Sequence, residues 1–228
     1  MLATLDEIEQ RLAEVDAELS RRNEPRWERD PWAWLTECAY TVDEASQRQV
    51  SWPDWDYVHD LVECLQTERL VAIPKSRRMF ASWTVSGWIT WLARFHPYHA
   101  VFVQSENESK AAYLLDKRCR FIEEALPAHQ RRRYAALRTN EGLVGRMTYE
   151  RTGSYLWAVP QGDSVIRAFT FSVLVADEME FQPKGHEAFM AALPIVEKGA
   201  RMILLSSSNG PGGVIAGLCR EVGFARFR

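Results

Sequence analysis

Four short apolar runs constrain the fold of this chain more than any other feature. They are residues 70–73, 100–104, 172–176 and 201–205, and helical patterns such as residues 82–95 lie between them. Short runs of this kind are typical of strands that are buried on both faces of a sheet. Strands that alternate with helices predict an α/β domain with a mostly parallel sheet flanked by helices. In such sheets ligands bind where the strands end, so the residues that follow each run are candidates for a site.

Ahead of this pattern lies an amphipathic segment. Leu5, Ile8, Leu12, Val15 and Leu19 recur at alternating spacings of three and four, which predicts a helix. Its apolar stripe either packs on its own domain or forms a coiled coil with a partner. The polar residues 21–25 read as a linker, so we expect an N-terminal helix over 1–24 and a second domain over 25–228.

The next helices are marked by their first residues. Asp30 followed by Pro31 predicts a helix start, with Trp32, Trp34 and Leu35 as anchors. Asp54 is expected to open the following helix. Further along, Ser105 to Glu108 reads as a capping box for a helix that runs to about Leu126, and two strands are expected within residues 145–160.

Composition narrows the class of protein. The 228 residues are 46% hydrophobic and 26% charged, with a net charge of −3, as in an ordinary globular domain. No run is long enough to span a membrane, and the first residues do not resemble a signal peptide. The charge argues against a uniformly basic surface but allows a local DNA-contacting stripe. Four widely spaced cysteines are expected to be buried thiols.

The first candidate for chemistry is the basic segment after residues 70–73. It reads Pro74-Lys75-Ser76-Arg77-Arg78-Met79-Phe80-Ala81-Ser82. A phosphate-binding loop needs a helix N-terminus, a cation and a hydroxyl for Mg²⁺, and this segment has a suitable position and composition. The usual motif G-x-x-x-x-G-K-[ST] would have glycine and lysine where Phe80 and Ala81 stand. The segment is therefore either a variant phosphate loop or a basic turn without a ligand.

The other two candidates follow the last two apolar runs. Asp177 and Glu178 come directly after residues 173–176, where one acid can hold Mg²⁺ and the other can polarise water. The alternative for this pair is an ordinary helix N-cap. The loop at residues 206–213 can sense a γ-phosphate or can be a plain turn. Because a parallel sheet would gather all three segments at one edge, their joint occurrence favours a nucleotide site.

Together these segments resemble the ATPase region of phage terminase large subunits, which package DNA. Lys75-Ser76-x-Arg78 through Ser82 is similar to a variant Walker A motif with its lysine at the front of the loop. Further similarity lies in Val101–Ser105 with Ala111, in Gly153-Ser154, in Pro160–Gly162 with Arg167, in Leu174–Phe181 as a Walker B region, and in Ser206–Gly210 as a coupling motif. The likeness covers residues 52–213 and implies a P-loop NTPase fold of the ASCE or RecA-like class.

The resemblance also implies a role for each motif. The loop Lys75–Ser82 would bind ATP, with Lys75 and Arg78 on the β- and γ-phosphates. Ser82 and Asp177 would hold Mg²⁺, and Glu178 would activate the attacking water. The residues that would couple hydrolysis to movement are Ser207, Ser208 and Asn209.

Arginines supply a further part of such motors. A neighbouring subunit often contributes an arginine to the γ-phosphate, which is worth about 10³-fold or more in rate. The candidates are Arg138, Arg146, Arg151 and Arg167, and Arg167 is assigned the catalytic role here. The cluster Arg131-Arg132-Arg133 would either contact DNA phosphates or form a solvated helix face.

The sequence departs from the family pattern at three points. Phe80 replaces a glycine and is expected to crowd the phosphates. The adenine-side glutamine expected near Tyr57 has no counterpart, so Trp55 or Tyr57 either stacks on adenine or belongs to the core. The nuclease domain that usually follows the ATPase domain is expected to be absent, so no nuclease activity is predicted for this chain.

The function expected from the resemblance is that of a Mg²⁺-dependent ATPase that translocates double-stranded DNA into a prohead. The implied partners are the portal protein, the small terminase subunit and further copies in a ring, without a membrane. The implied location is the portal vertex in the host cytoplasm. The alternatives are a helicase-like remodelling ATPase and a non-catalytic assembly subunit that keeps the fold, which Phe80 and Ala81 favour.

Overall fold

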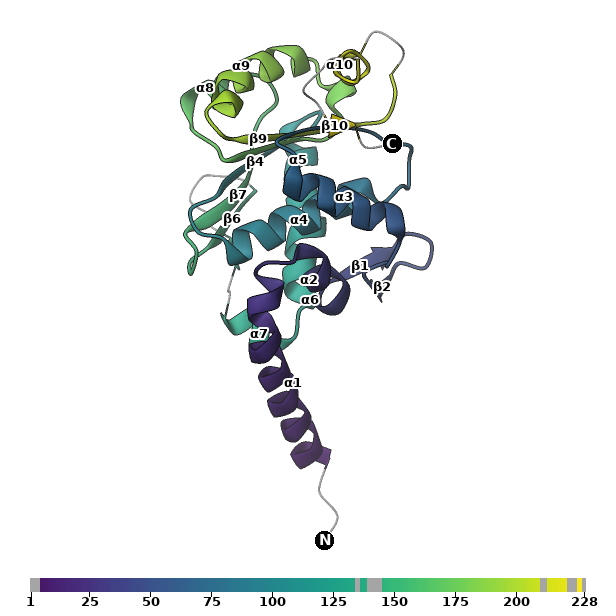
Figure 1. Ribbon diagram of the computed structural model, residues 1–228, viewed down its shortest axis with the longest axis vertical. Helices are drawn as coiled ribbons and strands as arrows, with labels where there is room; N and C mark the ends of the chain where they lie inside the picture. Colours follow the sequence, from purple (N-terminus) through teal and green to yellow (C-terminus); the bar gives the residue numbers. More distant parts are fainter. Residues whose placement is uncertain (1–4, 134–135, 139–144, 210–212, 221–224, 227–228) are drawn as a thin grey trace.

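A long N-terminal helix leads into an α/β body in which one sheet lies between helices (Figure 1). The computed structural model describes residues 5–133, 136–138, 145–209, 213–220 and 225–226. The described helices include none that combines the length and the apolarity needed to cross a membrane. Residues 210–212 of the predicted coupling loop lie outside the described residues.

The central sheet has eight strands in the order β10-β3-β9-β8-β4-β7-β6-β5. Its strands are β3 (Leu70–Pro74), β4 (Ala100–Gln104), β5 (Ala136–Arg138), β6 (Arg146–Tyr149), β7 (Ser154–Ala158), β8 (Val173–Ala176), β9 (Arg201–Ser206) and β10 (Ala225–Arg226). All pairings from β10 to β7 are parallel, and those of β6 with β7 and β5 are antiparallel. The predicted mostly parallel sheet is therefore confirmed. A separate antiparallel hairpin, β1 (Tyr40–Asp43) and β2 (Arg48–Ser51), was not predicted.

Helices cover both faces of the sheet. They are α1 (Leu5–Trp27), α2 (Pro31–Cys38), α3 (Asp56–Thr67), α4 (Ala81–Phe95), α5 (Glu108–Leu114), η1 (Leu115–Arg120), α6 (Phe121–Ala125), α7 (Ala128–Arg133), α8 (Ser164–Ala168), η2 (Met179–Phe181), α9 (Gly185–Glu197) and α10 (Val214–Leu218). Successive residues of a strand point to opposite faces, so Val101 and Val103 join one core cluster and Phe102 joins another. The first cluster includes α4 and the second includes α9. Flanking helices on both faces are thus confirmed.

Two local predictions are wrong. Residues 21–25 form no linker, because α1 continues to Trp27 and includes Pro25. The Trp27 indole donates to Glu37, and the Trp27 carbonyl accepts from Trp91, so tertiary contacts fix this segment as helix. The capping box at Ser105 is also displaced: Asn107 is the cap, and its side chain accepts a hydrogen bond from the N–H of Lys110. The helix expected to run to Leu126 is interrupted by the π-helix η1.

The cysteines are partly as predicted. All four thiols are unpaired with one another, and Cys38 and Cys119 are buried. Burial raises the pKa of each of these two thiols to about 11. Cys64 and Cys219 are only partly buried, so the expectation of buried thiols is confirmed for one pair and not for the other.

Helix α4, which begins at the candidate phosphate loop, is fixed in the core by a close approach at Gly87. A Cβ atom there would lie 2.6 Å from Trp52 Cη2 and 2.7 Å from Leu35 Cδ2, both on buried side chains. We expect Gly87→Ala to lower the free energy of unfolding by about 1–3 kcal/mol through overpacking. The roughly 1 kcal/mol that alanine gains in helix propensity offsets part of this loss, so the net destabilisation is up to about 2 kcal/mol.

The matched control for this prediction is Gly217→Ala in α10, where an added Cβ would meet nothing within 4 Å. There the propensity gain acts alone, so stability should stay the same or rise slightly. Chemical denaturation of both variants measures the difference. A Gly87→Ala protein as stable as Gly217→Ala would contradict the packing described for α4.

Candidate active site

Three neighbouring parallel strands bring the predicted motifs to one edge of the sheet. Lys75 follows β3, Asp177 follows β8, and Ser206 ends β9, which pairs with both. The Lys75 N–H donates to the Ser206 carbonyl at 2.9 Å, and the Asp177 N–H donates to the Gln104 carbonyl of β4 at 2.9 Å. The ladder therefore continues into the loops and fixes the backbone from which the polar side chains extend.

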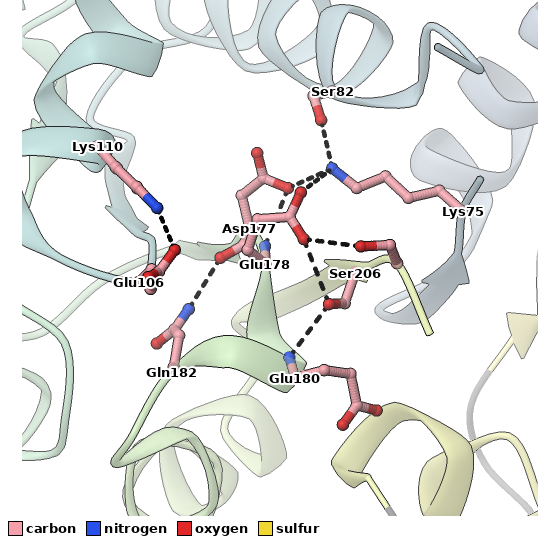
Figure 2. A network of polar contacts seen from close by, with 10 residues as sticks. Lys75, Ser82, Glu106, Lys110, Asp177, Glu178, Glu180, Gln182 and Ser206 are labelled. Carbon is pink, nitrogen blue, oxygen red and sulfur yellow. Dashed lines mark hydrogen bonds and ion pairs between the residues drawn. The ribbon is translucent and has the colours of Figure 1, made fainter. Parts of the chain in front are cut away.

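The ammonium group of Lys75 is the centre of this site (Figure 2). Its Nζ lies 2.7 Å from Asp177 Oδ1, 2.8 Å from Ser82 Oγ and 3.1 Å from Glu178 Oε1. The Lys75 and Asp177 side chains are only 11% and 10% exposed, so these contacts are weakly screened by water. The structure thus brings together the predicted lysine, the predicted metal-binding hydroxyl and both predicted acids.

The same oxygens suit a magnesium ion. Mg²⁺ prefers hard oxygen ligands, and the Ser82 hydroxyl and the Asp177 carboxylate converge on one positive charge, which is the ammonium of Lys75. Lys75 therefore stands where a metal cation would be held. Because its side chain is a flexible four-carbon stem, it can leave these oxygens without any backbone change.

The loop that carries these groups has an unusual backbone. Arg78 and Phe80 have φ values of 64° and 57°, and Glu178 has a φ of 51°. Left-handed conformations cost non-glycine residues about 1–3 kcal/mol each and concentrate at functional sites. Phe80 is the residue before α4, so the turn directs the N-terminus of a 15-residue helix toward the loop. Such a terminus attracts phosphate groups.

The Phe80 ring is held in an aromatic cluster. Its centroid lies 5.1 Å from that of Trp52, 5.9 Å from that of Trp55 and 6.2 Å from that of Trp83. This packing holds a bulky residue at a backbone position that favours glycine. Phe80 also lines the loop cavity. It therefore separates the aromatic cluster from the loop.

Two adjoining cavities lie at the loop. One of about 300 Å³ is lined by Lys75–Trp83 together with Glu44, Arg118, Glu178 and Ser207. The other, of about 520 Å³, is mostly apolar and lies between the β1–β2 hairpin, Trp55 and Phe80. The two share Glu44, Arg78, Phe80 and Trp83 as lining residues. A polar cavity thus lies beside a mostly apolar one.

Two charged residues of the loop cavity, Arg118 and Glu44, were missed by sequence analysis. Arg118 lies on the π-helix η1, and its guanidinium is 5.7 Å from the centroid of the Trp83 ring. Glu44 lies in the turn of the unpredicted hairpin, and its carboxylate is 3.8 Å from Nε of Arg78. Neither belongs to a sequence motif, and only the tertiary packing of η1 and the hairpin brings them to the loop.

The predicted coupling residues differ in their contacts. The Ser207 hydroxyl lies 3.4 Å from Glu178 Oε2, at the long end of the hydrogen-bond range. The Asn209 side chain donates to the Glu180 carbonyl at 3.3 Å, and Ser208 is exposed. Ser206 belongs to the predicted coupling motif but was assigned no role. It lies 3.5 Å from Glu178 Oε2 and accepts from the Glu180 N–H (Figure 2).

The Glu180 carboxylate extends this network to α10. It accepts hydrogen bonds from the N–H groups of Ile215 at 2.7 Å and Ala216 at 3.3 Å. Ser206 therefore connects the candidate base, Glu178, to a residue that caps a helix.

Of the predicted arginines, the three whose side chains are described, Arg146, Arg151 and Arg167, line neither cavity. Arg167 is exposed and donates to Asp163 at 2.7 Å on its own helix, and Arg151 pairs with Glu24 at 3.4 Å. Arg146 lies 4.0 Å above the Tyr155 ring. The side chain of Arg138 and those of residues 132–133 lie outside the described part of the chain, and Arg131 is exposed. A role for Arg167 on a neighbouring copy stays a prediction.

Trp55 and Tyr57 were predicted to stack on adenine or to belong to the core. Trp55 is 48% exposed and lines the apolar cavity, and Tyr57 stacks on it with the ring centroids 5.7 Å apart. Trp55 is thus outside the core and has a ring face near open space. Tyr57 packs against that ring in a stacked arrangement.

No family model matches this sequence. Several solved structures do share its fold. The large terminase of bacteriophage HK97 matches 87% of this chain and 43% of its own, with 10% identity and a TM-score of 0.65. The large terminase of the thermophilic bacteriophage D6E matches 76% of this chain and 45% of its own, with 11% identity and a TM-score of 0.59.

The third comparison is with a single domain. The large terminase ATPase domain of Thermus phage P74-26 matches 76% of this chain and 84% of its own, with 13% identity and a TM-score of 0.53. This chain therefore spans less than half of the two full terminases and most of the isolated ATPase domain. The predicted fold is confirmed, and this chain has the fold of the ATPase domain of phage large terminases.

Proposed function

We propose that this chain hydrolyses ATP as the motor domain of a phage DNA-packaging terminase. The observation that carries the proposal is the convergence of Lys75, Ser82, Asp177 and Glu178 beside a cavity at the carboxyl edge of a parallel sheet. Two solved D6E terminase structures with the same fold are complexes with ADP and with ATP-gamma-S. A polar cavity lined by a lysine is suited to the same kind of ligand.

Each group has a task in hydrolysis. A triphosphate at the N-terminus of α4 would draw Lys75 away from the acids toward the β- and γ-phosphates. Ser82 and Asp177 would then hold Mg²⁺, which neutralises charge that develops on the phosphate oxygens when it is bound. Glu178, no longer paired with Lys75, would accept a proton from the attacking water. Arg118 lines the same cavity, and its charge would add to the stabilisation of the phosphates.

The further parts of the proposal follow from the likeness to terminases. The substrate moved would be double-stranded DNA, and the partners would be the portal protein, the small terminase subunit and other copies in a ring. Arg167 would reach the γ-phosphate of a neighbouring copy, and Ser207, Ser208 and Asn209 would couple hydrolysis to movement. The site of action would be the portal vertex of the prohead in the host cytoplasm.

The test is Mg²⁺-dependent ATP hydrolysis by the purified chain, alone and with proheads and double-stranded DNA. We expect the chain to bind ATP and to turn it over faster when both are present. Binding of a labelled ATP analogue without turnover under either condition would instead favour a non-catalytic assembly subunit. Strand separation of a DNA duplex would favour the remodelling ATPase.

The apolar cavity beside the loop is proposed to take the adenine base. Trp55 offers a half-exposed ring there, and base stacking on such a ring is worth about 1–3 kcal/mol. We expect Trp55→Ala to weaken ATP binding by about tenfold. Binding of inorganic tripolyphosphate, which has no base, should be unchanged in the same variant.

Isothermal titration with both ligands measures this difference. Phe169→Ala is the matched control, because Phe169 is an exposed aromatic residue that lines neither cavity. Equal losses for ATP and tripolyphosphate in Trp55→Ala would mean that Trp55 shapes the loop and does not contact the base.

A further inference from the structure

The first two-thirds of α1 extend away from the α/β body (Figure 1). The apolar stripe of this helix is exposed to solvent, with 77% of Leu5, 46% of Ile8, 59% of Leu12, 55% of Val15 and 50% of Leu19 accessible. The contacts of α1 with the body occur near its C-terminal end, where Ser20 bonds to His129 and Trp27 bonds to Glu37. Of the two sequence interpretations, packing of this stripe on its own domain is therefore wrong.

The stripe also points away from the body. In the heptad that places Leu5, Leu12 and Leu19 at a, position f lies on the opposite side of the helix and includes Glu24. Glu24 is buried and pairs with Arg151 of the body at 3.4 Å. Because f faces the body, the a and d residues remain available to another molecule.

The residue types at a and d indicate what kind of molecule packs against the stripe. The a positions are leucines, and the d positions Ile8 and Val15 are β-branched. Leucine at a with β-branched residues at d favours parallel coiled coils of more than two helices. In such a coiled coil of identical helices, each apolar stripe packs against the same stripe of the other helices. The partner that best fits the stripe of α1 is therefore another copy of α1.

The flanking charges fit a parallel arrangement of identical helices. Position g holds Arg11 and position e of the next heptad holds Asp16, so each copy offers opposite charges to its neighbour. An antiparallel pair would instead oppose Glu9 to Asp16. In that arrangement an ion pair between Glu18 and Arg11 could offset this repulsion. Glu18, however, already pairs with Arg21 and Arg22 of its own helix, at 2.6 Å and 3.2 Å.

We propose that α1 is a self-association element, in which more than two copies of this chain join their N-terminal helices as a parallel coiled coil. The stripe spans about two heptads, which is short for an isolated coiled coil. Association through α1 alone is therefore reversible and concentration-dependent. The proposal depends on α1 and its surface, and it stands whether or not the chain hydrolyses ATP.

Sedimentation velocity of the full chain over a range of concentrations tests this proposal. We expect oligomers larger than a dimer that dissociate on dilution. Leu12→Glu places a charge at a and should raise the apparent dissociation constant by about tenfold or more. Gln10→Glu introduces the same residue at an exposed f position, on the side of the helix opposite the stripe, and should leave association unchanged. Far-UV circular dichroism of both variants verifies that α1 remains folded.

A charge exchange tests the orientation. Arg11→Glu should weaken association by opposing two acids, and adding Asp16→Lys should restore it. In an antiparallel pair, Asp16→Lys alone would strengthen association by relieving the contact with Glu9, and this result would contradict the proposal. A chain that remains monomeric at high concentration, or a Leu12→Glu protein that associates like Gln10→Glu, would also overturn it.

Discussion

Replacing Glu178 with glutamine should lower the turnover of ATP by about 10²–10⁴-fold while nucleotide affinity changes little. The amide keeps the shape of the side chain but cannot accept a proton from water. Glu178 lines the loop cavity, with one oxygen 3.1 Å from Lys75 Nζ and the other 3.4 Å from the Ser207 hydroxyl. Loss of its charge removes one ion pair of Lys75 and leaves the pair with Asp177, so the phosphate loop is retained.

Steady-state hydrolysis and equilibrium binding of an ATP analogue measure the two quantities separately. The matched control is Glu187→Gln, which makes the same change at an exposed residue of α9 outside both cavity linings. Turnover in Glu178→Gln that equals the control would remove Glu178 from the mechanism. If the affinity for the ATP analogue fell as much as turnover, Glu178 would be needed for the shape of the site and not for the chemical step.

Replacing Lys75 with alanine should change the affinities for ATP and for Mg²⁺ in opposite directions. ATP binding should weaken by about 10–100-fold, because a charged hydrogen bond to the phosphates contributes roughly 1.5–3 kcal/mol. Mg²⁺ alone should bind more tightly, because the ammonium no longer competes for the oxygens of Ser82 and Asp177. The two acids are also left close together without a cation, so Mg²⁺ should raise the unfolding temperature of this variant more than that of the parent.

Titration calorimetry with each ligand and thermal unfolding with and without Mg²⁺ provide the measurements. Lys198→Ala, at an exposed lysine after α9, serves as the control. If Mg²⁺ alone binds Lys75→Ala no better than the parent chain, the ammonium does not occupy the metal position. That result would leave Ser82 and Asp177 as a hydrogen-bonded cluster without a role in metal binding.

The sheet and most of the site could be predicted because they depend on local patterns. A strand buried on both faces needs an uninterrupted apolar run, and the bounds predicted for β4 agree with the structure. The carboxyl ends of parallel strands must lie at one edge, so Lys75 and Asp177 could be predicted to lie at the same edge. The pairing of β9 with both β3 and β8 then brings them into contact. Here the sequence specifies topology, and the topology specifies the site.

The remaining features depend on contacts between distant segments. The end of α1 is fixed by the hydrogen bond from the Trp91 indole to the Trp27 carbonyl, which joins residues 64 positions apart. The position of Arg118 depends on η1, because a π-helix shifts the direction of later side chains relative to an α-helix. The apolar cavity exists because the β1–β2 hairpin lies over Phe80. No periodicity of the sequence encodes these arrangements.

The central claim is that Lys75 exchanges its acidic partners for phosphates. A crystal structure with Mg²⁺ and a slowly hydrolysed ATP analogue tests it most directly, through the distance from Lys75 Nζ to Asp177 Oδ1, which is 2.7 Å here. The account predicts that Nζ moves to hydrogen-bonding distance of a phosphate oxygen and that Ser82 and Asp177 surround the metal. A nucleotide bound elsewhere, with the Lys75–Asp177 ion pair intact, would contradict it.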